Sequence, residues 1–136
     1  MDNWLLAALI SLVIYGFWGF FPKLAVTYID PQSALAYEVA GAALVGLLAL
    51  GLVHFQPQTH PKGILFAVLT GIAGMAGTLF YLAAARHGKI TVVVSITALY
   101  PLFTILYAAL FLREPVTMKQ FAGMVLALVA IVLLSG

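Results

Sequence analysis

Five long apolar runs divide the chain, and short segments with most of its charged residues and prolines separate them. A helix needs about 20 mainly apolar residues to cross a hydrocarbon core of about 30 Å, and the runs have about 17 to 23 residues each. The pattern therefore predicts an all-α integral membrane protein, a single transmembrane domain over residues 1–136 with short loops. The predicted helices cover about residues 3–21, 31–53, 63–85, 90–112 and 118–134.

Two prolines lie within this pattern. Pro22 cannot donate to the carbonyl of Trp18, but such kinks are tolerated in membrane helices, so the first helix ends near residue 21 or continues to about Tyr28. Pro101 lies near the middle of the fourth run and leaves the carbonyl of Thr97 without its usual donor. We predict that both prolines act as structural hinges.

Two helix starts have clear sequence signals. Asp30 followed by Pro31 is typical of an N-cap and the first helical position. Thr117 and Gln120 are spaced as a capping box, in which each side chain satisfies the other residue's backbone donor. The polar stretch at residues 54–62 is predicted to be a loop.

Composition leads to the same class of protein. The chain is 65% hydrophobic and 7% charged, whereas soluble domains have about 25% charged residues. The six scattered Lys and Arg residues make no patch for nucleic acid, and there is no cysteine. The first run lacks a basic segment before it and is interpreted as a retained span.

Catalytic chemistry has no support in the sequence. The four carboxylates are spread apart, and no nucleophile with a matching base or phosphate-binding loop is present. His54, His60 and His87 lack metal-ligand spacing. We therefore expect no enzyme activity, no cofactor and no metal.

The basic loop residues favour neither orientation in the membrane. Three of them lie on the N-terminal side of the predicted topology and three on the other, whereas an excess of Lys and Arg normally marks the cytoplasmic side. The balance favours insertion in both orientations, although the free amino group, the translocon or an oppositely oriented partner could still decide one. The two groups are Lys62, Arg113 and Lys119, and Lys23, Arg86 and Lys89.

Glu38 is the most informative single residue, because an ionisable group inside a membrane span is costly. Lys23 lies at a similar depth if the first helix continues past Pro22, and the two side chains would then form an ion pair. The alternative is that Glu38 binds a proton or a cation. The sequence leaves both interpretations open.

Aromatic and hydroxyl side chains are expected in the same half of the membrane as Glu38. Together they could line a substrate-binding cavity that attracts cations. Each of them taken singly is more often part of a helix core or of the membrane interface than of a binding site. The predicted site consists of Glu38, Tyr15, Trp18, Tyr81, Ser95 and Thr97.

Small residues recur along two of the predicted helices, where they would let backbones approach closely. Most such stripes mark contacts within a subunit, as expected for the third span, where Thr70, Gly74 and Thr78 recur every four residues beside Gly71 and Gly77. The stripe of Gly123, Ala127 and Ala130 in the fifth span is the predicted dimer contact.

These features resemble the EamA domain of the drug/metabolite transporter superfamily, in its single-domain, five-span bacterial form. The matching features are Trp18-Gly19 with Lys23, Pro31 at the start of the second span, and the stretch from Leu79 to Gly136. Within that stretch the resemblance lies in the short basic loop, the mid-helix proline, a glutamate after the fourth span and a glycine in the fifth.

The resemblance implies one inverted-repeat half of a ten-helix secondary transporter in a bacterial inner membrane. It implies pairing with a second, inverted copy and export or exchange of small metabolites or drugs by alternating access. Membrane lipid and, where transport is coupled to them, protons are the further expected partners. Many members carry a basic residue near the position of Glu38, so their substrates do not transfer to this chain. A lipid-linked substrate flippase subunit and a non-transporting accessory subunit are the alternatives.

Overall fold

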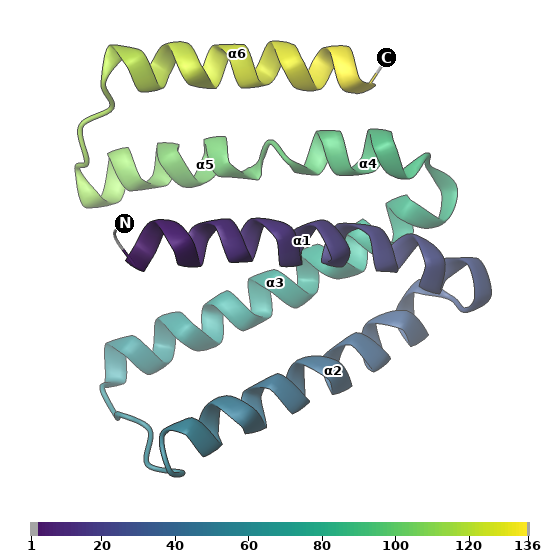
Figure 1. Ribbon diagram of the computed structural model, residues 1–136, viewed down its shortest axis with the longest axis vertical. Coiled ribbons are helices and arrows are strands. Elements are labelled where there is room, and N and C mark those ends of the chain that lie inside the picture. Colours follow the sequence, from purple (N-terminus) through teal and green to yellow (C-terminus); the bar gives the residue numbers. More distant parts are fainter. Residues whose placement is uncertain (1–2, 136) are drawn as a thin grey trace. The chain divides into compact units, whose positions relative to one another are not determined.

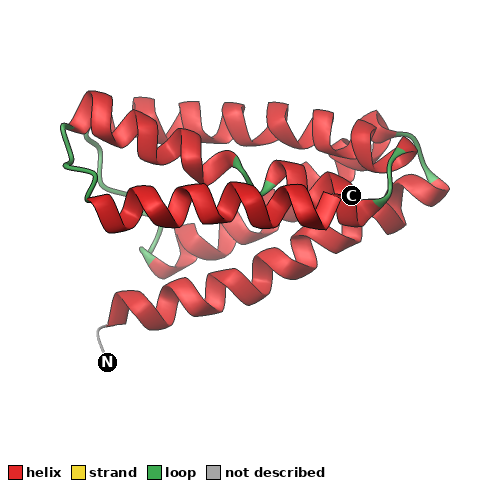
Figure 2. Ribbon diagram, turned by 90° about the horizontal axis from the view of Figure 1, so that it is seen from above, coloured by secondary structure: helices red, strands yellow, loops and turns green. Residues whose placement is uncertain are grey.

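The structure is a computed structural model that describes residues 3–135 (Figure 1). Each regular element in this range is a helix (Figure 2). Four helical segments of the described chain are long and apolar enough to cross a membrane, the fourth being residues 90–112, and the predicted all-α membrane fold is confirmed. Contacts divide the chain into two compact units, residues 1–87 and 88–136.

The first unit consists of α1 (Asn3–Tyr28), α2 (Pro31–Leu52) and α3 (Pro61–His87), and each helix contacts the other two. Because α1 continues through Pro22 to Tyr28, the longer of the two predicted first helices is right. The predicted loop at residues 54–62 extends two residues too far, since α3 already begins at Pro61. His60 Nδ1 accepts a bond from the Gly63 N–H over 3.4 Å at this helix start.

Asp30 caps α2 as its sequence position predicts. Its carboxylate accepts bonds from the backbone N–H of Ser33 over 2.9 Å and from the Ser33 hydroxyl over 2.6 Å. These two bonds favour the charged form and lower the pKa of Asp30 below its ordinary value of 3.8. The cap fixes the turn that follows α1.

The second unit consists of α4 (Ile90–Thr97), α5 (Tyr100–Tyr107), the π-helix η1 (Ala108–Leu112) and α6 (Met118–Ser135). In Figure 1, α6 runs back along the chain segment before it, and it contacts α4. The predicted fourth helix is not one kinked helix, because a turn at Ala98 and Leu99 interrupts it just before Pro101. The π-helix η1 is a further feature without a sequence signal.

The capping box at the start of α6 is confirmed. The Thr117 N–H donates to Gln120 Oε1 over 2.8 Å, and the Gln120 N–H donates to Thr117 Oγ1 over 3.3 Å. This reciprocal pair satisfies donors that have no partner within the helix. The apolar part of α6, Met118–Leu134, is shorter than the other four candidate spans.

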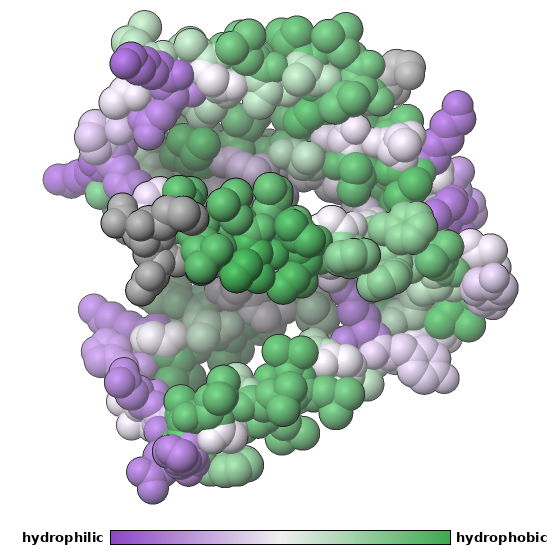
Figure 3. All heavy atoms as spheres, viewed as in Figure 1, coloured by the Kyte–Doolittle hydropathy of each residue, from purple (hydrophilic) through white to green (hydrophobic). Residues whose placement is uncertain are grey.

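Few side chains of the candidate spans are buried within the chain. The buried share of their most apolar stretches ranges from 0% to 11%, and Figure 3 shows hydrophobic residues along the outer sides of the helices. Apolar surface of this extent is stable only against lipid or another protein chain. The exposure therefore agrees with an integral membrane protein.

Candidate functional site

A hydrogen bond between α1 and α2 is the centre of the candidate site. Trp18 Nε1 donates to Glu38 Oε1 over 2.8 Å. Glu38 is partly exposed, and 43% of the Trp18 surface is exposed. Glu38 lies seven residues after Pro31, so it is about 10 Å from the start of α2 at 1.5 Å per residue. The Glu38 carboxylate therefore lies well inside the candidate span of α2.

Tyr81 joins α3 to the same place. Its ring stacks on the Trp18 indole with centroids 5.4 Å apart and planes inclined by 24°. Its hydroxyl donates to the carbonyl oxygen of Gly19 over 2.6 Å. Only 5% of Tyr81 is exposed. One face of Trp18 is thus covered by a ring that is itself fixed by a hydrogen bond.

Lys23 makes a second bond between α1 and α3. Its Nζ donates to the carbonyl oxygen of Ala85 over 2.7 Å. Ala85 is fully buried and lies in the last turn of α3, where carbonyls have no donor within the helix. Lys23 therefore caps the C-terminal end of α3 with a positive charge, which the helix dipole favours there.

The two hydrogen bonds between α1 and α3 join residues with the same separation in sequence. Gly19 and Tyr81 are 62 residues apart in sequence, and so are Lys23 and Ala85. In each helix the two residues are one turn apart, so α1 and α3 run in the same direction. Pro22 lies within this doubly fixed segment of α1 and is buried. Pro22 therefore lies between two residues of α1, Gly19 and Lys23, that are hydrogen-bonded to α3.

The arrangement leaves Glu38 able to do further chemistry. The indole N–H occupies one acceptor position of a carboxylate that offers about four. Because the indole is a neutral donor, it does not neutralise the negative charge of Glu38. A proton, or the amino group of a bound molecule, could do so. The exposed part of the Trp18 ring is also suited to a cation.

The other predicted site residues have different surroundings. Tyr15 lies on α1 three residues before Trp18, and 61% of it is exposed. Ser95 and Thr97 belong to the second unit and donate to carbonyls of their own helix, those of Thr91 and Val93, over 2.7 and 2.9 Å. The structure therefore brings Trp18, Glu38 and Tyr81 together. The predicted roles of Tyr15, Ser95 and Thr97, and the Lys23–Glu38 ion pair, stay predictions.

The predicted small-residue contacts are open to the outside. Apart from the adjacent residues and the backbone of the same helix, no atom of the described chain lies within 4 Å of a methyl group placed on Gly71, Gly74 or Gly77. Thr78 of the same stripe is buried, so the expected close packing is seen at Thr78 and not at the glycines. A methyl group on Gly123 would likewise meet no atom within 4 Å, and Ala127 and Ala130 are exposed. The α6 stripe is thus available to another chain.

Sequence reasoning missed Gly19 and Ala85, which enter the site through backbone carbonyls. The one available signal was Pro22, since a proline frees a carbonyl in the preceding turn. It pointed to the carbonyl of Trp18, one residue before Gly19.

Comparison with known proteins agrees with this fold. The profile of the EamA-like transporter family matches residues 2–136. An uncharacterized protein of Methanocaldococcus jannaschii is 27% identical over 135 residues, which make up 99% of this chain and 98% of that protein. No solved structure matches the chain. The family match extends over nearly every residue, and the chain belongs to the EamA-like transporter family.

Proposed function

We propose that this chain is one half of a secondary transporter that moves small metabolites or drugs across a bacterial inner membrane by alternating access. Two copies in opposite orientation form the working unit. The observation that carries the proposal is the Trp18–Glu38–Tyr81 cluster, an acidic and aromatic group held by three helices inside the span. Glu38 is the residue that accepts a proton or the amino group of the substrate.

The membrane family supports transport as the class of activity. An ionisable group within a span marks a substrate or ion pathway by default, because its cost must be offset by a role or a partner. Among transporters, substrate sites near the midplane between inverted repeats are common. Glu38, about 10 Å into α2, has a suitable depth.

The antiparallel pairing rests on two further features. Three basic residues lie on each of the two predicted sides of the membrane, so their distribution favours neither orientation. The small-residue stripe on α6 is exposed and lets two backbones approach. An interrupted helix at Ala98 and Leu99 supplies a place where the second unit can bend.

Binding can be tested with the chain's own fluorescence. The sequence has two tryptophans, so Trp4→Phe leaves Trp18 as the single indole reporter. We expect phenethylamine to displace the indole N–H from Glu38 and to shift the Trp18 emission in a saturable way. Glu38→Gln in the same background should abolish the response.

Transport is then measured as uptake of radiolabelled phenethylamine into proteoliposomes with and without a pH gradient. Saturable uptake that Glu38→Gln removes would support the proposal. Binding without uptake would identify an accessory subunit. Neither binding nor uptake across a series of aromatic amines, amino acids and quaternary ammonium ions would refute the role of the cluster.

A further inference from the structure

A pocket in the second unit lies at the C-terminal end of the candidate span Ile90–Leu112 and shares no residue with the Trp18–Glu38–Tyr81 cluster. It has a volume of about 110 Å³ and lies where η1 ends and the loop to α6 begins. Its walls are mostly apolar and come from the end of α5, from η1, from the loop and from the first turn of α6, and its two polar residues are Glu114 and Gln120. The span Ile90–Leu112 ends just before this loop, so the pocket is expected at the level of the lipid headgroups.

The backbone fixes the position of Glu114. Arg113 has a left-handed conformation with φ of 55°, which ends η1 abruptly. Its N–H donates to the Ala108 carbonyl, and the Glu114 N–H reaches the same oxygen over 3.4 Å. Two donors on one carbonyl hold the reversal of the chain, as in other left-handed helix ends. Glu114 therefore leaves the helix end at a defined place.

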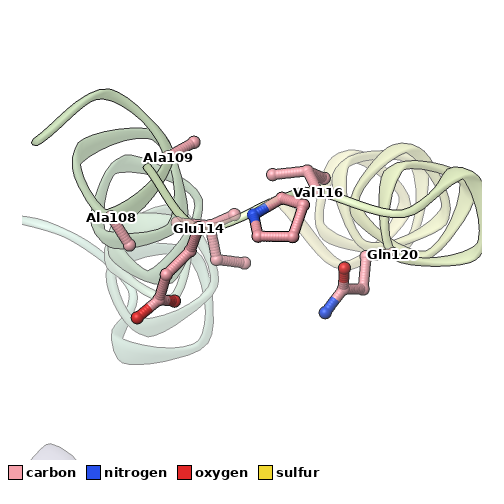
Figure 4. Close-up of a pocket in the computed structure, with 7 residues that line it drawn as sticks. Ala108, Ala109, Glu114, Val116 and Gln120 are labelled. Atoms are coloured by element: carbon pink, nitrogen blue, oxygen red, sulfur yellow. The ribbon is translucent and has the colours of Figure 1, made fainter. Parts of the chain in front are cut away.

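The capping box fixes Gln120 in the opposite wall. Its Oε1 accepts bonds from the Thr117 N–H over 2.8 Å and from the Thr117 hydroxyl over 3.0 Å. With the oxygen held in this way, the amide nitrogen is the end that turns outward. Figure 4 shows this nitrogen and the Glu114 carboxylate pointing to the same side from the two walls.

The pocket thus presents a negative acceptor and a neutral donor beside an apolar wall. A divalent metal ion is a poor fit, since Ca²⁺ takes six to eight oxygen ligands and the pocket has one carboxylate. A zwitterionic headgroup fits better, because its ammonium can donate to Glu114 while its phosphate accepts from Gln120. Arg113 and Lys119 add positive charge on both sides of Glu114 in the sequence, which also suits a phosphate.

We propose that this pocket binds the headgroup of an ethanolamine phospholipid. The ammonium donates to the Glu114 carboxylate, and the phosphate accepts from the Gln120 amide, with Arg113 and Lys119 adding positive charge nearby in the sequence. The volume of about 110 Å³ holds several water molecules, and hence an aminoethyl group. A choline headgroup has no N–H to donate, so the pocket distinguishes the two lipids. The proposal does not depend on the transported substrate.

The test uses the full chain purified in detergent. Short-chain dihexanoyl phosphatidylethanolamine and dihexanoyl phosphatidylcholine are titrated separately, and the thermal unfolding midpoint gives an apparent affinity for each. We expect ethanolamine lipid to bind about tenfold more tightly than choline lipid, the size expected for one charge-assisted hydrogen bond. Glu114→Gln should remove this preference.

Two further variants separate the pocket from general surface charge. Gln120→Glu keeps the oxygen that the capping box needs and removes the amide donor, so it should weaken both lipids while α6 stays folded by circular dichroism. Asp30→Asn removes a surface carboxylate of the first unit, keeps a capping side chain, and should leave the tenfold preference unchanged.

The proposal is overturned if the wild type binds both lipids equally, or if Glu114→Gln keeps the preference for ethanolamine. Water-soluble phosphoethanolamine is titrated in parallel. If it binds as tightly as the lipid, the ligand is a free headgroup compound and the lipid assignment is wrong.

Discussion

Tyr81→Phe isolates one hydrogen bond between α1 and α3. The change removes the hydroxyl that donates to the Gly19 carbonyl over 2.6 Å, and it keeps the ring that stacks on Trp18 at 5.4 Å. Because the hydroxyl is removed and no larger group is introduced, the loss is that of a single bond. Hydrogen bonds between membrane helices average about 0.6 kcal/mol with maxima near 1.7 kcal/mol, and this one is short and buried. We therefore expect a loss of about 1 kcal/mol in the free energy of unfolding.

The assay is equilibrium unfolding of the purified protein in mixed micelles with increasing sodium dodecyl sulfate. Tyr37→Phe is the matched control, since Tyr37 lies on α2 of the same unit and is 72% exposed. We expect the control to unfold like the wild type. Tyr81→Ala should cost about 3 kcal/mol or more, because it also removes the ring from a buried site. Equal stabilities of Tyr81→Phe and Tyr37→Phe would refute the proposed bond between α1 and α3.

Three other predictions concern the second unit's bend, the orientation of the chain and the cap of α2. Pro101→Ala should leave the protein folded or make it more stable, while slowing amine uptake into proteoliposomes; unchanged uptake would show that the break before Pro101 is only tolerated. A reporter fused to the C-terminus should be detected on both sides of the membrane, and detection on one side would exclude dual insertion. The lowered pKa of Asp30 means that its contribution to stability is complete above its ordinary value of 3.8 and is lost as the pH falls through the lower folded-state value. Asp30→Asn should therefore unfold at a midpoint that depends less on pH between 5 and 2, as followed by circular dichroism, and an identical pH dependence would contradict the cap.

Much of the fold followed from local sequence signals. Asp30 and the Thr117–Gln120 box cap their helices as predicted, because capping depends on residues three positions apart. The interruption of the fourth run was only partly predicted. Pro101 indicated a disturbance, but whether a helix bends or breaks depends on how neighbouring backbone groups are satisfied. The π-helix η1 depends on the chain reversal at Arg113 and has no signal in residue type.

The candidate site was predictable as a group of residue types and not as a set of contacts. Trp18, Glu38 and Tyr81 were singled out because polar and aromatic side chains are conspicuous in apolar spans. Their partners Gly19 and Ala85 contribute only backbone oxygens, which every residue has. The register between α1 and α3 follows from packing in three dimensions, and a single sequence carries no record of it. The structure likewise supplied Lys23 with a partner on α3 that charge pairing did not suggest.

In the proposed function, Glu38 acts on the substrate or a proton and does not only balance the charge of Lys23. The most direct measurement compares Glu38→Gln, Lys23→Met and the double variant for unfolding free energy and for the pH dependence of amine uptake. Glu38→Gln keeps an oxygen for the Trp18 indole, so we expect near wild-type stability, loss of the pH-dependent amine uptake, and stability losses that add in the double variant. Strong destabilisation of Glu38→Gln that Lys23→Met reverses, with recovery of transport, would show a structural ion pair and contradict the proposed role of Glu38.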